Sequence, residues 1–229
     1  MSDPAFRRMS VEEYLRTEEK NPYKREYVGG FVYPLHAHAG ASRAHVRISV
    51  NVTAALNADA LREGCHLYQS DMKLAVEGNS TFFYPDVMLV CDRLSGSEDA
   101  ETAPCLLVEV LSSSTAAHDR VGKYTAHTAL PSLQTCLIVE QDERRVYAYT
   151  REGGKWELQE LVGQGSIPLP CLGRALTLNE IYAGVLWVVT QHQAALGADR
   201  GGGQGVRGGP GHGASGGRAY LGQGRAGWT

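Results

Sequence analysis

The 229-residue chain lacks any run of roughly 18 apolar residues, the length that a membrane-spanning helix needs. Its first ten residues contain no apolar stretch after their two arginines, so the sequence predicts neither a secretory signal nor a membrane partner. It also lacks a phosphate-binding loop, a dinucleotide-binding fingerprint and a Ser-His-Asp motif. Aromatic residues make up only 8% of the chain, which argues against the sugar-binding cleft of a glycosidase with paired carboxylates.

Cysteine is scarce, and its spacing predicts neither a disulfide framework nor a zinc site. There are five cysteines, an odd number, and no two are separated as in C-x-x-C. Three of them, Cys91, Cys105 and Cys136, lie in or beside apolar, strand-like runs. We therefore expect buried, reduced thiols and, because reduced thiols are typical of the cytoplasm, a cytoplasmic protein.

The chain also has fewer basic than acidic residues, 22 against 25. The formal net charge is −3, and the residues from Gly197 onward contain four arginines and one acid, so the rest of the chain is more acidic still. A protein that binds duplex nucleic acid unaided usually has a basic surface. The charge balance therefore argues against strong, non-specific binding of DNA.

The N-terminal part of the sequence predicts a helix, a hairpin and a second helix. Ser10 and Glu13 form a capping-box pattern ahead of a short helix that ends near Thr17. Residues 26–33 are apolar on both sides of a Gly-Gly pair, which is typical of a β-hairpin. Residues 42–62 form the clearest amphipathic pattern, with apolar residues at helical spacing and a glycine at position 64.

The middle of the sequence is dominated by strand patterns. Residues 66–76 alternate, whereas residues 82–91 and 105–112 are apolar on both faces, as central strands are. A helix over residues 115–129 follows. Further strands are expected over residues 133–140, 145–150 and 156–161, and a last helix over residues 176–191.

The composition changes abruptly near the C-terminus. Residues 197–229 contain 14 of the 27 glycines and almost no aliphatic side chains. Such a segment cannot bury enough apolar surface to offset the entropy lost on ordering. We therefore expect one folded domain over residues 1–196 and a disordered Gly/Arg-rich tail over residues 197–229.

Two carboxylates interrupt the apolar strand patterns. Asp86 lies in YPDVMLV and Glu109 lies in LLVEVL. A buried carboxylate is costly unless it is paired, hydrogen-bonded or bound to a metal ion. Each acid could cap a backbone group or pair with an arginine, but two on neighbouring strands indicate a shared site. Carboxylates are the ligands that Mg²⁺ prefers.

A lysine follows on the helix expected after the second strand. Lys123 comes 14 positions after Glu109 and shares a helix face with Arg120 and His127. Its alternative role is that of an ordinary solvated lysine. However, a helix that leaves the strand of Glu109 can fold back over the carboxylates, so Lys123 is a candidate for the same site.

The order of these residues, PD followed by Glu and Lys, resembles the PD-(D/E)XK nuclease superfamily. The chain is more closely similar to the Uma-two family of restriction endonuclease domain proteins, which are common in bacteria. The resemblance extends from about Val11 to Val185 through the motifs VEEYL, EYVGG, AGASRAH, SDMK, YPDVMLVCD, VEVLSSST and LPSL. It implies an α/β, restriction-endonuclease-like fold, with a central mixed β-sheet flanked by helices and an N-terminal helix and hairpin.

The resemblance also implies roles for individual residues. Asp86 and Glu109 would bind Mg²⁺ (or Mn²⁺), and Lys123 would replace the lysine that usually stands two positions after the glutamate. Glu26 is similar to an extra acid that completes such sites. His45 stands where the family has a histidine at the start of the long helix, and a core or capping role is its alternative.

The implied activity is metal-dependent endonucleolytic cleavage of a nucleic acid, with Lys123 stabilising the transition state. The alternative is a non-cleaving module on a nuclease fold that binds nucleic acid or a protein, and a homodimer is left open. The sequence departs from the family pattern at Gly29 and Phe31, where acids are usual, and at His127, where an aromatic residue is usual. The Gly-rich tail has no counterpart in the family.

Overall fold

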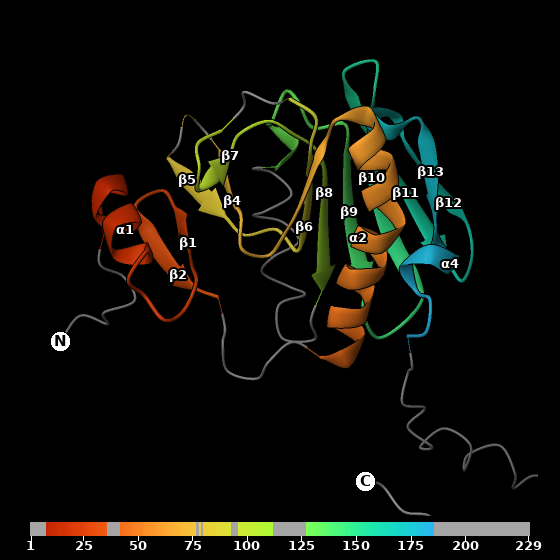
Figure 1. Cartoon of the computed structure of the whole chain (residues 1–229), viewed down its shortest axis with the longest axis horizontal. Helices are drawn as coiled ribbons and strands as arrows, with labels where there is room; N and C mark the ends of the chain where they lie inside the picture. The colour runs from red at the N-terminus through yellow and green to blue at the C-terminus, as the bar shows by residue number, and fades with distance from the viewer. Residues whose placement is uncertain are drawn as a thin grey trace, which may run out of the picture. The chain divides into compact units, whose positions relative to one another are not determined.

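The structure, a computed structural model, describes residues 8–35, 42–76, 78, 80–92, 96–111 and 127–185. The contacts divide the chain between Val188 and Val189, and every described residue belongs to the first of the two units. That unit combines a few helices with a six-stranded, a five-stranded and a two-stranded sheet (Figure 1). The predicted α/β class with mixed sheets is therefore confirmed.

The N-terminal segment forms the predicted helix and hairpin. Ser10 caps the helix, since its hydroxyl accepts a hydrogen bond from the N–H of Glu13 at 3.2 Å. The hairpin turns at Gly29 and Gly30, whose φ angles of 58° and 91° suit glycine. The elements are α1 (Val11–Glu18), β1 (Arg25–Val28) and β2 (Phe31–Pro34).

The hairpin belongs to a five-stranded sheet with the order β2-β1-β5-β4-β7. Its other strands are β4 (Lys73–Val76), β5 (Thr81–Phe83) and β7 (Ala100–Glu101). A small core covers it, in which the rings of Tyr14 and Tyr27 stack 5.0 Å apart and Phe82 lies 5.4 Å from Tyr14. These aromatic contacts attach α1 to the sheet.

The larger sheet has six strands in the order β11-β10-β9-β8-β6-β3. Strands β8 and β9 run parallel and their neighbours run antiparallel, so the sheet is mixed. Every residue of β6 and β8 is buried, as their apolar sequences predict. The strands are β3 (His66–Gln69), β6 (Val87–Val90), β8 (Pro104–Leu111), β9 (Thr135–Glu140), β10 (Arg145–Glu152) and β11 (Lys155–Val162).

Helix α2 (Arg43–Glu63) covers one face of this sheet (Figure 1). Ser42 caps its first turn, and Gly64 ends it with a φ of 70°. Ile48, Val52 and Leu56 are fully buried in a core that includes alternate residues of β6 and β8. Burying each such side chain contributes about 1.5–3 kcal/mol, so this packing holds the helix on the sheet.

Two predicted strands are interrupted in the structure. The alternating run over residues 66–76 is broken at Ser70, whose positive φ of 32° turns the chain from β3 in one sheet into β4 in the other. The apolar run over residues 82–91 is likewise divided between β5 and β6. Pro85, which has no N–H to donate, stands in the break just before Asp86.

The C-terminal part of the described chain differs from the expected helix. Residues 166–177 form a two-stranded sheet interrupted by a short 3-10 helix, and the α-helix that follows is a single turn, opened by a capping box between Thr177 and Glu180. Residues from 186 onward, and most of the helix expected over residues 115–129, lie outside the described residues. The elements are β12 (Ser166–Leu169), η2 (Pro170–Leu172), β13 (Arg174–Thr177) and α4 (Leu178–Ile181).

The expectation that all the cysteines are reduced is wrong, because Cys65 and Cys91 form a disulfide. Strand β3 begins just after Cys65 and pairs antiparallel with β6, which ends just before Cys91. Since His66 faces Val90, the two sulfurs meet beyond the ends of the paired strands, a juxtaposition that cysteine spacing alone does not reveal. The cytoplasmic location predicted from reduced thiols loses that support. No helix in the described part of the chain is long and apolar enough to cross a membrane.

Candidate active site

Asp86 lies at the start of β6, and its carboxylate is held on both oxygens. Its Oδ1 lies 3.0 Å from Nε2 of His45, and its Oδ2 accepts a hydrogen bond of 2.7 Å from the N–H of Val110. The side chain is 17% exposed, because the strand is interrupted at this point. Asp86 is therefore fixed in orientation where an inner strand of the sheet begins, and it is partly exposed.

Glu109 lies within β8 and is only 8% exposed. Side chains alternate along a strand, so Glu109 shares a face with Leu107 and Leu111, which line the core on the side opposite α2. Burial raises the pKa of the Cys136 thiol on the adjacent strand β9, and the negative charge of Glu109 raises it further.

The strand register brings the two acids to neighbouring positions. Strands β6 and β8 pair antiparallel with Val87 opposite Val108, and one further step along the pair leads to Asp86 and Glu109. The hydrogen bond from the N–H of Val110 to Asp86 links the same two segments. Asp86 therefore immediately precedes β6, and Glu109 lies in β8 one residue beyond the last paired position, Val108.

His45 lies in the first turn of α2, and its side chain is 18% exposed. The hydrogen bond with Asp86 raises the pKa of His45, against the smaller opposing effect of burial. The packing of α2 on the sheet explains this contact, because the buried face of the helix carries its N-terminal turn to the start of β6. His45 is therefore a direct neighbour of Asp86 rather than a residue of the core.

The remaining candidates lie elsewhere or outside the described residues. Glu26 is buried in β1, opposite Tyr33 of β2, in the five-stranded sheet. Lys123 lies within residues 112–126, which the structure does not describe. His127, where the family has an aromatic residue, is fully buried with its ring edge-on to Phe83 at 5.2 Å, and so packs as an aromatic residue does.

The N-terminal helix is anchored to the segment that precedes Asp86. The buried Glu18 accepts hydrogen bonds from the N–H and the guanidinium of Arg25, at 2.8 Å each, and from the hydroxyl of Tyr84 at 3.1 Å. Tyr84 stands two residues before Asp86. This network fixes the chain on the N-terminal side of the candidate site.

Several polar groups around the site were not predicted from the sequence. The ammonium group of Lys24 donates to the carbonyl of Ser70 at 2.9 Å and pairs with Asp71, and the N–H of Ser70 donates to the carbonyl of Asp86 at 3.3 Å. Both contacts of the Ser70 backbone depend on the turn at this residue, which the alternating pattern of residues 66–76 does not predict. On α2, the exposed Arg43 and Arg47 flank His45 in sequence.

The donor set suits a hard divalent cation. Among residues 8–185, as far as the structure describes them, no three His, Cys, Asp or Glu side chains gather closely enough to enclose a metal ion. Mg²⁺ does not require such a cage, since it is commonly held by one or two carboxylates together with water and substrate phosphate. Asp86 and Glu109 are the two carboxylates that the sequence predicted as such ligands.

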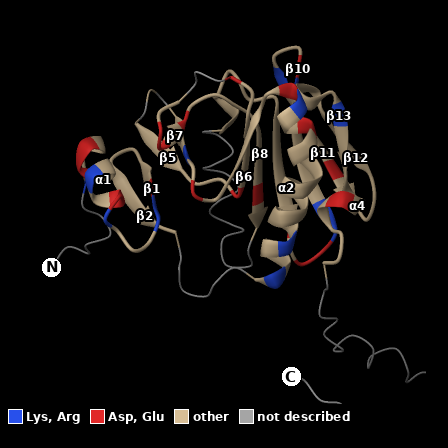
Figure 2. Cartoon of the chain, viewed as in Figure 1, with Lys and Arg blue, Asp and Glu red and all other residues tan. Residues whose placement is uncertain are grey.

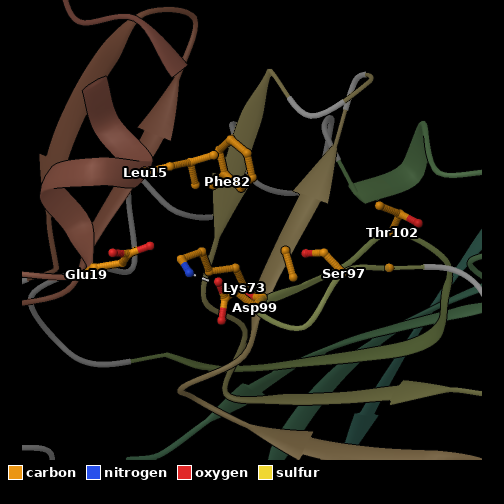
Figure 3. Close-up of a pocket in the computed structure, with 9 residues that line it drawn as sticks. Leu15, Glu19, Lys73, Phe82, Ser97, Asp99 and Thr102 are labelled. Atoms are coloured by element: carbon orange, nitrogen blue, oxygen red, sulfur yellow. Dashed lines mark hydrogen bonds between the residues drawn. The ribbon is translucent and has the colours of Figure 1, made fainter. Parts of the chain in front are cut away.

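The described part of the chain also has a pocket of about 360 Å³ whose lining includes neither acid (Figure 3). It is bordered by α1, β4, β5 and the segment around β7. Glu19, Lys73 and Asp99 are among the side chains that line it, and the ammonium group of Lys73 lies 3.5 Å from the carbonyl of Asp99. The pocket contains none of the predicted site residues.

Comparisons with known proteins identify the family of the chain. Residues 11–179 match the model of the Uma2 family, described as "Putative restriction endonuclease". Two uncharacterized proteins of Synechocystis sp. are similar: one is 34% identical over 183 residues, covering 79% of this chain and 94% of that protein, and the other is 33% identical over 162 residues, covering 69% and 90%.

Among solved structures, a "putative nuclease belonging to DUF820" from Anabaena variabilis has a similar fold. The TM-score is 0.60 and the sequence identity is 17%, over 78% of this chain and 99% of that one. At this level of identity the likeness shows the fold alone.

Proposed function

Because the chain belongs to the Uma2 family of restriction-endonuclease-like proteins, we propose that it is a metal-dependent endonuclease that hydrolyses phosphodiester bonds of a nucleic acid. The observation that carries the proposal is the antiparallel register of β6 and β8, which, continued one step beyond Val87 and Val108, leads to Asp86 and Glu109. In this proposal Asp86 and Glu109 hold Mg²⁺ or Mn²⁺.

The surroundings of Asp86 support this assignment. A carboxylate that accepts hydrogen bonds from His45 and from the N–H of Val110 is fixed in one orientation. Each oxygen has further lone pairs with which it can bind a metal ion. Such outer contacts orient the ligand and are typical of metal sites.

Each residue then has a separate task. A divalent ion at this position supplies neutralisation of the phosphate charge and acidification of a bound water. Glu109 contributes its carboxylate from a buried strand, where the low dielectric strengthens its interaction with a cation. His45 positions Asp86. Lys123 is assigned, from the sequence, to the charge that builds up on the phosphate in the transition state.

Basic side chains near the site favour a polyanionic substrate. Arg43 and Arg47 are exposed and lie four residues apart on α2, with His45 between them in the sequence. Figure 2 shows basic residues on α2 in blue. Lys24 is linked to Asp86 through Ser70: its ammonium group donates to the carbonyl of Ser70, and the N–H of Ser70 donates to the carbonyl of Asp86. Exposed arginines can bind phosphates even where the domain as a whole is acidic.

The test is cleavage of single-stranded, duplex and branched nucleic acids with Mg²⁺ or Mn²⁺. Asp86→Asn, Glu109→Gln and Lys123→Ala should each abolish the cleavage without loss of folding, judged by circular dichroism. The matched controls are Glu157→Gln and Lys155→Ala, both on the exposed strand β11. Cleavage that survives Glu109→Gln, or that is lost equally in the controls, would contradict the proposal.

A second function, binding of nucleic acid or a protein without cleavage, is favoured by one observation. Both oxygens of Asp86 already accept hydrogen bonds within the protein, as a purely structural carboxylate would. The two functions differ in one measurable way. A non-cleaving protein should bind its partner in the presence of a chelator as tightly as in the presence of Mg²⁺.

A further inference from the structure

Four of the five cysteines lie close together on the α2 side of the large sheet. Cys65 follows α2 and is bonded to Cys91, which follows β6. Cys105 lies in β8 and is buried, and Cys171 lies in the short helix η2 and is half-buried. Cys136 lies in the core on the opposite face of the sheet.

The sulfur atoms of this cluster are in mutual contact. Sγ of Cys105 lies 3.6 Å from Sγ of Cys91, which is close to van der Waals contact. Cys171 packs against the core that contains Cys105, and its thiol interacts with that of Cys105. The contacts therefore run in series from the thiol of Cys171, through that of Cys105, to the disulfide of Cys91 and Cys65.

The pair of free thiols is polarised. The hydrogen bond with Cys171, and also burial, raise the pKa of Cys105, whereas the hydrogen bond from Cys105 lowers the pKa of Cys171. Cys171 is therefore the more acidic of the two thiols. A thiolate next to a thiol is the arrangement in which the first can remove the proton of the second.

The position of Cys171 is set by contacts to α2. Arg174, three residues later, donates to the carbonyl of Ala55 at 2.8 Å and to the carboxylate of Asp59 at 2.8 Å. These bonds tie the segment that contains η2 to the middle of the helix. Cys171 is thereby held beside Cys105.

We propose that Cys171, Cys105, Cys91 and Cys65 form a thiol–disulfide exchange site. The proton of Cys105 passes to the thiolate of Cys171, and the sulfur of Cys105 forms a bond to Sγ of Cys91. The bond between Cys91 and Cys65 breaks, and Cys65 leaves with the electron pair as a thiolate. The step is an isomerisation, in which one disulfide replaces another and no oxidant or reductant is consumed.

The exchange changes which elements are cross-linked. The bond between Cys65 and Cys91 joins the end of α2 to the end of β6, whereas a bond between Cys91 and Cys105 joins two strands that are already paired. Exchange therefore releases the C-terminal end of α2 from β6. The N-terminal turn of the same helix contacts the start of the same strand through His45 and Asp86.

The surroundings make the site open to small thiols and disulfides. Cys91 is exposed and Cys171 is half-buried, whereas Cys65 and Cys105 are buried. A small external thiol can therefore attack the disulfide at Cys91, and a small external disulfide such as oxidised glutathione can react with the thiol of Cys171. The proposal does not depend on nuclease activity and is tested without it.

The first experiment follows the wild-type protein. A pulse of iodoacetamide, followed by acid quenching and peptide mapping, should reveal alkylated Cys65 together with a cross-link between Cys91 and Cys105. In Cys171→Ser the alkylation of Cys65 should be at least about tenfold slower, because the base is removed. In Cys105→Ser it should be lost, and in Cys136→Ser it should be unchanged.

The second experiment traps the product. Cys65→Ser, exposed to oxidised glutathione, should form the disulfide between Cys91 and Cys105, and Cys65→Ser/Cys105→Ser should not. Circular dichroism confirms that each variant is folded. The proposal is overturned if Cys91 and Cys105 remain free thiols in Cys65→Ser after exposure to oxidised glutathione. It is also overturned if Cys65 is alkylated as fast in Cys105→Ser as in the wild type.

Discussion

Replacing His45 by glutamine should destabilise the protein by an amount that depends on pH. The pKa of His45 is raised by its hydrogen bond with Asp86, so the pairing adds stability that is fully present below pH 6.5 and is lost as the pH rises through the folded-state pKa. A hydrogen bond to a charged group contributes about 1.5–3 kcal/mol and a neutral one about 0.5–1.5 kcal/mol. Because both side chains are less than one-fifth exposed, screening by solvent is modest.

The free energy of unfolding of the wild type and of His45→Gln is measured by urea denaturation at pH 5.5 and pH 8.5, with a chelator to keep metal from Asp86. The difference between the two proteins should be larger at pH 5.5, by about 1 kcal/mol. His66→Gln, on the exposed position of β3, is the matched control and should show a small effect at both pH values. Equal differences for His45→Gln at the two pH values would refute the reasoning.

Three further predictions follow from the described structure. If Arg43 and Arg47 contact phosphates, the double change to alanine should lower the slope of log affinity against log salt by about two, measured by fluorescence anisotropy with a labelled oligonucleotide; an unchanged slope would place the phosphates elsewhere. Leu137→Ala, which empties a fully buried position in β9, should cost about 2–5 kcal/mol in urea denaturation, whereas Leu158→Ala on exposed β11 should cost about 0.5 kcal/mol or less; equal costs would contradict the assigned core. Removing residues 197–229 should leave the Tm nearly unchanged, and a fall of several degrees would show that the tail packs on the domain.

The elements that the sequence predicted best are those whose burial follows a regular period. Helix α2 has apolar residues at helical spacing and ends at Gly64 as predicted, and strands β6 and β8 are buried on both faces as their composition requires. In these segments local pattern and tertiary packing agree. The class of fold could therefore be predicted before any three-dimensional information.

The interruptions could not be predicted in the same way. Ser70 adopts a positive φ that its residue type seldom adopts, and Pro85 divides a continuous apolar run between two sheets. A break that leaves the alternation of apolar and polar residues intact cannot be detected from that alternation. As a result Asp86, expected within a strand, lies at the break, where His45 and the N–H of Val110 reach it.

Contacts between residues distant in the sequence could not be predicted from the pattern either. The pairing of Cys65 with Cys91 depends on the register of β3 and β6, which is set by side-chain packing across the sheet. The pair of acids was identified because a charged residue in an apolar strand is conspicuous on its own. A cysteine in the same setting is indistinguishable from an ordinary small apolar residue.

The most direct test of the metal site is the thermal stability of the purified protein with and without Mn²⁺. A ligand that binds only the native state stabilises it by about 2.7 kcal/mol at 100 times its Kd. The wild type and the control Glu157→Gln should therefore show a higher Tm with Mn²⁺, and Asp86→Asn and Glu109→Gln should not. A wild-type Tm that Mn²⁺ leaves unchanged, or a rise that persists in Glu109→Gln, would contradict the assignment of these two carboxylates as metal ligands.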